Sequence, residues 1–207
     1  MFRPLEKREA KSNLKLDIDK HLVIFVGQFK PGKGILDIIN AVKIYNSNPV
    51  NKKNIKFLML GMATDQDFLS EMTDLIELNR LDSLIELTGF KKNIQMYMQA
   101  ADVLILPSHE GTEGMGRVIF EAMSCGTAVI GTNTTGIREA VTNDTGLLVP
   151  EKSPLDLASA ISKLIDNDIL RDEFAMNGRK RALEYFDIKN HAEKISEVYQ
   201  ELINQNL

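Results

Sequence analysis

Two carboxylates, Glu113 and Glu121, lie eight positions apart in the segment AADVLILPSHEGTEGMGRVIFEAMSCG, residues 100–126. Gly114 and Gly116 stand between them, and glycine lets a bulky group approach the backbone closely. If the second half of the segment is a helix, its first turn offers unpaired N–H groups and a positive dipole end. These residue types therefore indicate an anion site, best suited to phosphate, that is framed by two acids.

The elements expected around these acids are a strand, a polar loop and a helix. Residues 103–106 are an apolar run that is too short for an ordinary helix and is typical of a buried strand. An apolar helical pattern begins near Gly116, which places Glu121 about two turns into a helix and roughly 12 Å from Glu113. That separation is comparable to the length of a nucleotide-diphospho-sugar, so one acid could hold sugar hydroxyls and the other ribose hydroxyls.

A second loop that could bind phosphate, QFKPGKG, follows the strand expected at residues 21–27. Gly27, Gly32 and Lys33 come one residue short of a P-loop. Gly34 stands where that motif needs Ser or Thr to hold magnesium, so the pattern disfavours an ATPase or a kinase.

The residues PS…EGMGRVIFEAMSCGTAVI resemble the Glu-(seven residues)-Glu signature of the retaining GT-B glycosyltransferases of family four. FVGQFKPGKG is similar to the phosphate loop of the same family. The resemblance runs from residue 25 to about residue 199 and covers half of such an enzyme. It implies the carboxyl-terminal, donor-binding lobe of an enzyme that moves a sugar from a nucleotide-diphospho-sugar to an acceptor hydroxyl. The amino-terminal, acceptor-binding lobe would be a missing partner.

The resemblance also implies roles for individual residues. Glu113 would be the catalytic residue that orients the donor sugar and stabilises positive charge at the anomeric carbon, and Glu121 would hold the ribose. Lys33 and the helix start would neutralise the diphosphate, so that neither a metal nor another cofactor is required. The expected donor-binding residues are Gly27, Gln28, Lys33, Gly89, Phe90, Lys91, His109, Gly114, Met115, Gly116, Arg117, Val118 and Glu121.

One position departs from the family pattern. Gln28 stands where the family has an arginine, which removes a bidentate cationic partner of the diphosphate. Arg117 or Lys30 is our candidate replacement for that charge. An Arg117→Ala variant with unchanged affinity for nucleoside diphosphates would exclude Arg117.

The rest of the chain alternates between strand and helix patterns. Strands are expected at 21–27, 55–60, 84–88, 103–106, 127–131 and 145–149, and helical patterns occur at 65–80, 154–165, 169–185 and 188–203. This alternation predicts an α/β fold with a single Rossmann-like, doubly wound and mostly parallel sheet. We expect residues 1–20 to be a solvated linker remnant and 21–187 to be the nucleotide-sugar-binding domain. Residues 188–207 would form a helix that crosses to the missing lobe.

Composition excludes several other classes. The 207 residues carry a net charge of −4 and no basic stripe, which argues against nucleic-acid binding. The one cysteine, Cys125, precedes a glycine at the expected helix end and is interpreted as a structural thiol. No apolar run reaches the roughly 18 residues that a bilayer span needs. We therefore expect a soluble, cytoplasmic protein, with peripheral membrane contact only through the missing lobe.

One alternative function stays open, and another is disfavoured. A non-catalytic nucleotide-sugar-binding or partner subunit is compatible with half an enzyme and with Gln28. A nicotinamide-dependent dehydrogenase is disfavoured because no G-x-G-x-x-G follows the first strand. The methionines, Met59 and Met62 among them, are expected to fill the core. The patterns do not distinguish uridine, guanosine and adenosine donors.

Overall fold

The computed structural model describes residues 2–50, 53–186 and 188–205. Within these ranges six strands form one parallel sheet in the order β3-β2-β1-β4-β5-β6. The predicted strands are confirmed to within one residue at each end, and the Rossmann-like α/β class is confirmed with every strand parallel. The strands are β1 (His21–Val26), β2 (Ile55–Leu60), β3 (Ile85–Gly89), β4 (Val103–Leu106), β5 (Ala128–Thr132) and β6 (Gly146–Val149).

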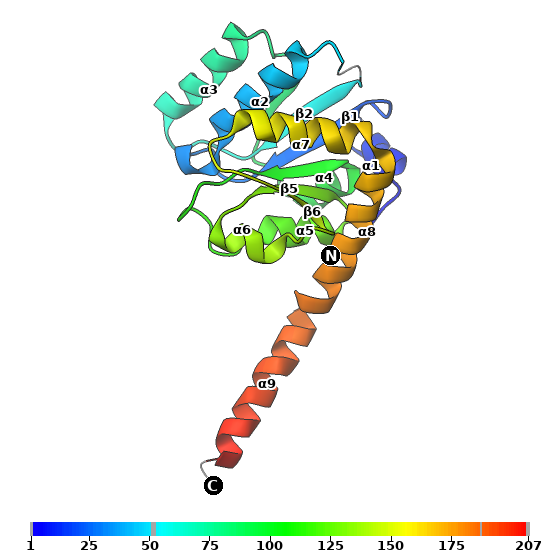
Figure 1. Cartoon of the computed structure of the whole chain (residues 1–207), viewed down its shortest axis with the longest axis vertical. Helices are drawn as coiled ribbons and strands as arrows, with labels where there is room; N and C mark the ends of the chain where they lie inside the picture. Colours follow the sequence, from blue (N-terminus) through cyan, green and yellow to red (C-terminus); the bar gives the residue numbers. More distant parts are fainter. Residues whose placement is uncertain (1, 51–52, 187, 206–207) are drawn as a thin grey trace.

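Helices cover both faces of this sheet (Figure 1). One face carries α2 (Ile35–Ser47), α3 (Gln66–Leu78) and α7 (Pro154–Asp166). The other carries α1 (Lys7–Asn13), α4 (Ile94–Ala100), α5 (Arg117–Ser124), α6 (Thr135–Ala140) and α8 (Asp168–Tyr185). The predicted helices are confirmed. The alternation of strands and helical segments also implied a helix after each strand, so α4 and α6 lacked only their bounds, whereas α1 was not expected as a helix.

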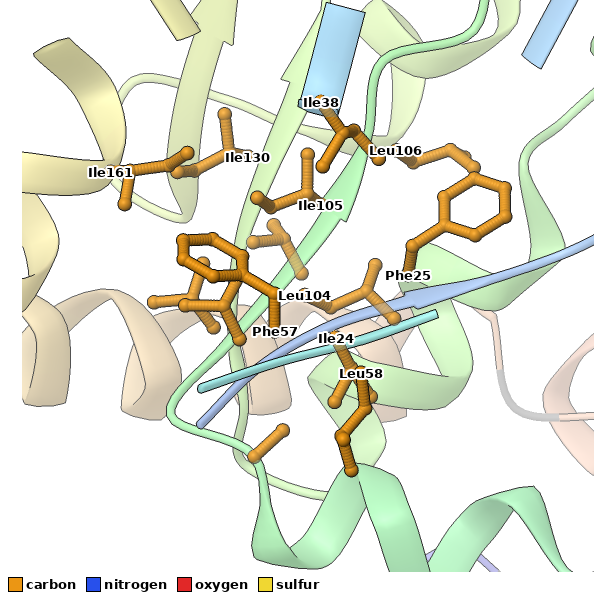
Figure 2. Close-up of a cluster of buried hydrophobic side chains, with 14 of the residues drawn as sticks. Ile24, Phe25, Ile38, Phe57, Leu58, Leu104, Ile105, Leu106, Ile130 and Ile161 are labelled. Carbon is orange, nitrogen blue, oxygen red and sulfur yellow. The ribbon is translucent and has the colours of Figure 1, made fainter. Parts of the chain in front are cut away.

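The central strands are apolar along their whole length because helices cover them on both sides. Figure 2 shows Ile105 and Ile130 on the same side as Ile38 of α2 and Ile161 of α7. All four side chains are at most 1% exposed. This burial fixes the register of the sheet and therefore the positions of the loops at its edge.

The strand order reverses direction between β1 and β4, which are neighbours in the sheet. The chain leaves β1 toward α2 on one face and leaves β4 toward α5 on the other. In open α/β sheets the crevice beyond the carboxyl ends of such strands is where ligands bind. The fold therefore brings together the two loops that sequence analysis selected for phosphate.

The amino-terminal segment is not a solvated stretch throughout, so that expectation is wrong for α1. Lys11 is 6% exposed and donates from Nζ to Asp102 Oδ2 at 3.0 Å and to the Lys20 carbonyl at 2.8 Å. Lys7 donates to the other Asp102 oxygen at 3.3 Å. Lys7 and Lys11 of α1 thus pair with Asp102, a buried acid about 90 positions away, and this contact attaches the helix to the sheet.

The last helix, α9 (Ile188–Gln205), projects away from the sheet and the other helices (Figure 1). Its apolar stripe is exposed: Ile195 by 44%, Tyr199 by 65% and Leu202 by 50%. The side chain of Ile188, part of the predicted stripe, lies outside the described residues. Among the helices described here, none has the length and apolar character that crossing a bilayer demands.

Candidate functional site

The loops that follow β1 and β4 meet backbone to backbone. Gly34 adopts φ of +67°, and a Cβ built there would lie 2.0 Å from the Pro107 carbonyl oxygen. The same contact continues at Gly32, whose carbonyl accepts from the His109 N–H and from Thr112 Oγ1, both at 2.9 Å. Only glycine permits this approach at position 34, so the first loop is held directly against the second.

This approach joins Lys33 to Glu113. The Lys33 ammonium forms an ion pair with Glu113 Oε1, and their side chains are 13% and 16% exposed. The Ser108 hydroxyl, fully buried, donates to the same carboxylate oxygen at 3.1 Å. The structure therefore brings together the cation expected on the diphosphate and the acid expected on the sugar.

His109 contacts Asp37, an acid that the sequence analysis did not select. Its Nε2 lies 2.7 Å from Asp37 Oδ2, and the two side chains are 22% and 18% exposed. Asp37 comes from the first turn of α2, three residues after Gly34. No motif includes this acid, and an acidic residue in a first helical turn is common, so the sequence carries no distinctive signal for it.

The start of α5 has the geometry expected of an anion site. Gly116 precedes the helix with φ of +57°, and among the described residues no side chain caps it. The first N–H groups of α5, from Arg117 and Val118, are therefore available to a ligand. The predicted length of helix between the two acids is wrong, because Glu121 is only the fifth residue of α5 and the four residues from Glu113 to Gly116 are loop. The rise of a continuous helix consequently does not give their separation.

Glu121 is half-buried on α5. Burial raises the pKa of its carboxyl, and the nearby Arg117 opposes that shift. Arg117 and Lys30 are both exposed, as is Gln28. Neither cation takes part in an ion pair within the described part of the chain. Both candidate replacements for the missing arginine are therefore outside any ion pair of the described residues, although Arg117 acts on the charge of Glu121.

A cavity of about 480 Å³ opens beside the first loop, at the carboxyl ends of β1, β2 and β3. Gly27, Gln28, Phe90 and Lys91 all line it, and Gly89, directly before Phe90, has φ of +71°. Met62 also lines it and is 59% exposed, so its assignment to the core is wrong. The sequence did carry a signal for Met62: it is an apolar residue directly after Gly61, just beyond the end of β2, where a side chain can line a cavity.

The remaining predicted residues lie on the loop before α5. Gly114 and Met115 are exposed, and α6 packs on this loop so closely that a Cβ at Gly136 would lie 1.8 Å from the Gly114 carbonyl oxygen.

Cys125 lies at the carboxyl end of α5 and is 3% exposed, and burial raises the pKa of its thiol to about 11. A thiol in that state is un-ionised and inert at neutral pH, as expected of a structural residue.

Solved structures with this fold include sugar-transferring proteins. The Anabaena protein HepE, crystallised with UDP and glucose, superposes with a TM-score of 0.84 at 25% identity, over 96% of this chain and 53% of that one. The carboxyl-terminal domain of the group 1 glycosyl transferase LpcC from Francisella tularensis gives 0.80 at 26% identity, over 90% and 96%.

Among curated proteins, the capsular polysaccharide biosynthesis glycosyltransferase CapM of Staphylococcus aureus is 29% identical over 193 residues. That alignment covers 93% of this chain and 49% of CapM, and the chain spans about half the length of the curated relatives it matches. A family model described as glycosyl transferases group 1 matches residues 6–181. Because that match takes in most of the chain and the fold agrees with it, the chain belongs to the group 1 glycosyl transferases.

Proposed function

We propose that this chain is the donor-binding half of a retaining glycosyltransferase, which transfers a sugar from a nucleotide-diphospho-sugar to an acceptor hydroxyl. The observation that carries the proposal is the meeting of Lys33 and Glu113 at the strand-order reversal, next to the free amino terminus of α5. The UDP and glucose in the HepE structure support this kind of ligand.

In this proposal the charge of the leaving diphosphate is met by Lys33 and by the N–H groups at the start of α5. Once the donor has displaced Glu113 from Lys33, these groups are in place, so they stabilise the charge that develops in the reaction without further reorganisation. No metal ion is needed for that task, and EDTA should leave nucleotide affinity unchanged.

The two acids would act on the two ends of the donor. Glu113 would orient the sugar and stabilise positive charge at the anomeric carbon, while Glu121 would hold the ribose hydroxyls. The retained configuration that the Glu-(seven residues)-Glu pattern implies can be read from the anomeric proton of the product by NMR.

The acceptor would be bound by a second, amino-terminal lobe, with residues 1–20 as the connection and α9 crossing to it. The exposed stripe of α9 and the half-length match to relatives support this arrangement. The protein would act in the cytoplasm, and any peripheral membrane contact would come through that lobe.

A non-catalytic binding subunit is the second candidate, favoured by Gln28 in place of arginine. Transfer assays with and without a separately expressed amino-terminal lobe distinguish the two. Sugar transfer by the pair supports the enzyme, and nucleotide binding without any transfer supports the subunit.

Calorimetric titration with UDP, GDP and ADP tests the donor site. Lys33→Met should weaken the best-bound nucleotide by about 100-fold, since it removes a charge-assisted contact and leaves Glu113 unpaired beside the phosphates. Glu121→Ala should weaken nucleotide binding by about tenfold, because the variant loses the hydrogen bonds to the ribose hydroxyls.

The matched control for that titration is Lys43→Met, which removes the same charge from an exposed position on α2. It should bind like the parent chain, and thermal melting of each variant shows whether it is folded. A folded Lys33→Met variant that binds within twofold of the parent would contradict the assigned diphosphate site.

A further inference from the structure

Asp37, in the first turn of α2, contacts His109 on the β4–α5 loop, residues 107–116. We propose that Asp37 is a positioning residue of the donor site, which acts through His109 to keep the loop of Glu113 in place when the donor binds. The inference rests on the proposed function, because it concerns the two segments that would hold the diphosphate.

In the described chain, two contacts between side chains join residues 27–37 to the β4–α5 loop. One is the ion pair of Lys33 with Glu113, and the other is the contact of Asp37 with His109. Under the proposed function the diphosphate takes Lys33 away from Glu113, so the first contact is broken in the bound state. The second contact does not involve Lys33 and remains. The bound state therefore depends on Asp37 more than the free state does, and only such a difference between the two states changes an affinity.

The hydrogen bonds to backbone that join the same two segments converge on one atom. The Gly32 carbonyl oxygen accepts from the His109 N–H and from Thr112 Oγ1, both at 2.9 Å. Attachment at one atom lets the loop turn about that atom. The contact with Asp37 supplies a second point of attachment, which prevents the turn.

Helix α2 is a rigid base for this second point. Ile35, Ile38 and Ile39 are at most 1% exposed, so the first turns of α2 cannot shift without disturbing a close-packed core. Asp37 lies among them in the sequence, and its side chain is 18% exposed. Its Oδ2 atom lies 2.7 Å from His109 Nε2. The loop is therefore attached to the part of the fold that moves least.

The contact extends from His109 to the catalytic acid through the neighbouring residue. An ionised carboxylate only accepts hydrogen bonds, so the hydrogen shared with Asp37 belongs to Nε2, and this bond fixes the orientation of the ring. Ser108 directly precedes His109, and its hydroxyl donates to Glu113 Oε1 at 3.1 Å. Holding His109 therefore also holds the residue that orients the Glu113 carboxylate.

A positioning role and a simple effect of charge predict opposite results. Because a diphosphate is anionic, the loss of a nearby acid would strengthen its binding by charge alone. The loss of a positioning contact would weaken it, since the diphosphate would lie between Lys33 and the start of α5. Those two groups belong to the segments that the Asp37 contact joins.

Calorimetric titration with UDP, GDP and ADP measures the effect on the best-bound nucleotide. Asp37→Ala should weaken its binding by about tenfold, because the hydrogen bond to His109 is lost. Asp37→Asn keeps an oxygen that accepts from Nε2 and should bind within about threefold of the parent. The matched control is Asp67→Ala, which removes an exposed acid from the first turn of α3 and should bind like the parent. Thermal melting shows whether each variant is folded.

A double-mutant cycle shows whether Asp37 acts through His109. If it does, Asp37→Ala combined with His109→Ala binds no more weakly than His109→Ala alone, whereas additive losses overturn the proposal. His109→Ala removes the same contact from its other side. It therefore tests the contact even if Asp37→Ala does not fold, and it should weaken binding by at least about tenfold.

The remaining outcomes separate this inference from the proposed function. If folded Asp37→Ala binds as tightly as the parent, or more tightly, Asp37 does not position the site, while the donor site stands. If Asp37→Asn is as weak as Asp37→Ala, the hydrogen bond from His109 does not explain the loss and the inference is wrong. If the parent chain binds no nucleotide, the proposed function fails and the inference fails with it.

Discussion

Asp102→Ala is expected to lower the free energy of unfolding by about 3–5 kcal/mol, because it leaves two lysines without their buried partner. The Asp102 carboxylate is 6% exposed and accepts from Lys7, from Lys11 and from the Leu22 N–H at 2.8 Å. Chemical denaturation followed by circular dichroism measures the loss. The matched control is Asp19→Ala, since Asp19 pairs with Arg8 at 3.7 Å while 80% exposed. A surface pair of this kind contributes little, so equal losses in the two variants would contradict the role given to Asp102.

The same acid gives the stability a defined dependence on pH. Burial alone would raise the pKa of Asp102, but Lys7, the Leu22 N–H and Lys11 together outweigh it and hold the pKa below its ordinary value. A carboxyl whose pKa is lowered by folding stabilises the folded state above its unfolded pKa, and this contribution is lost as pH falls through the folded pKa. Part of the acid sensitivity of the parent chain should therefore be absent from Asp102→Ala.

Gly34→Ala is expected to cost about 2–5 kcal/mol and to weaken nucleotide binding as well. A left-handed conformation costs a residue with a Cβ about 1–2 kcal/mol, and the Cβ would also collide with the Pro107 carbonyl. The collision forces apart the loops that carry Lys33 and Glu113, so stability and affinity should fall together in denaturation and titration experiments.

Gly111→Ala isolates the conformational part of that cost. Gly111 has φ of +75°, yet no atom lies within 4 Å of a Cβ built there. This variant should lose only the first 1–2 kcal/mol and keep its nucleotide affinity. If Gly34→Ala were no worse than Gly111→Ala, the close contact with Pro107 would not be important for the site.

The sheet was predictable from the sequence because each central strand is buried on both faces and leaves a continuous apolar run. The bounds of the short helices were not predictable in the same way. α1 was missed because Lys7 and Lys11 suggest a solvated face, and only the fold reveals Asp102 as their partner. α6 begins with Thr135 and Gly136, which are more typical of a loop.

The candidate site was predictable only where a motif carried it. The sequence indicated Lys33, Glu113 and the start of α5, but their direct contact depends on two loops 80 positions apart. Asp37 could not be selected from the sequence, because its role depends on contact with His109, which lies on another element. Met62 was assigned to the core because composition does not tell a cavity wall from a core residue.

The ion pair between Lys33 and Glu113 also determines what can displace it. In the proposed donor site, an incoming phosphate must compete for Lys33 with a carboxylate that is already in place and that accepts a hydrogen bond from the Ser108 hydroxyl. A small free anion makes no contacts beyond those of its own charge, so it competes poorly with Glu113 for Lys33. A nucleotide sugar can offset the lost pair with contacts to its base, ribose and sugar, and the released Glu113 becomes available at the same moment. If the chain binds its donor as proposed, this ion pair therefore favours a whole nucleotide sugar over inorganic phosphate.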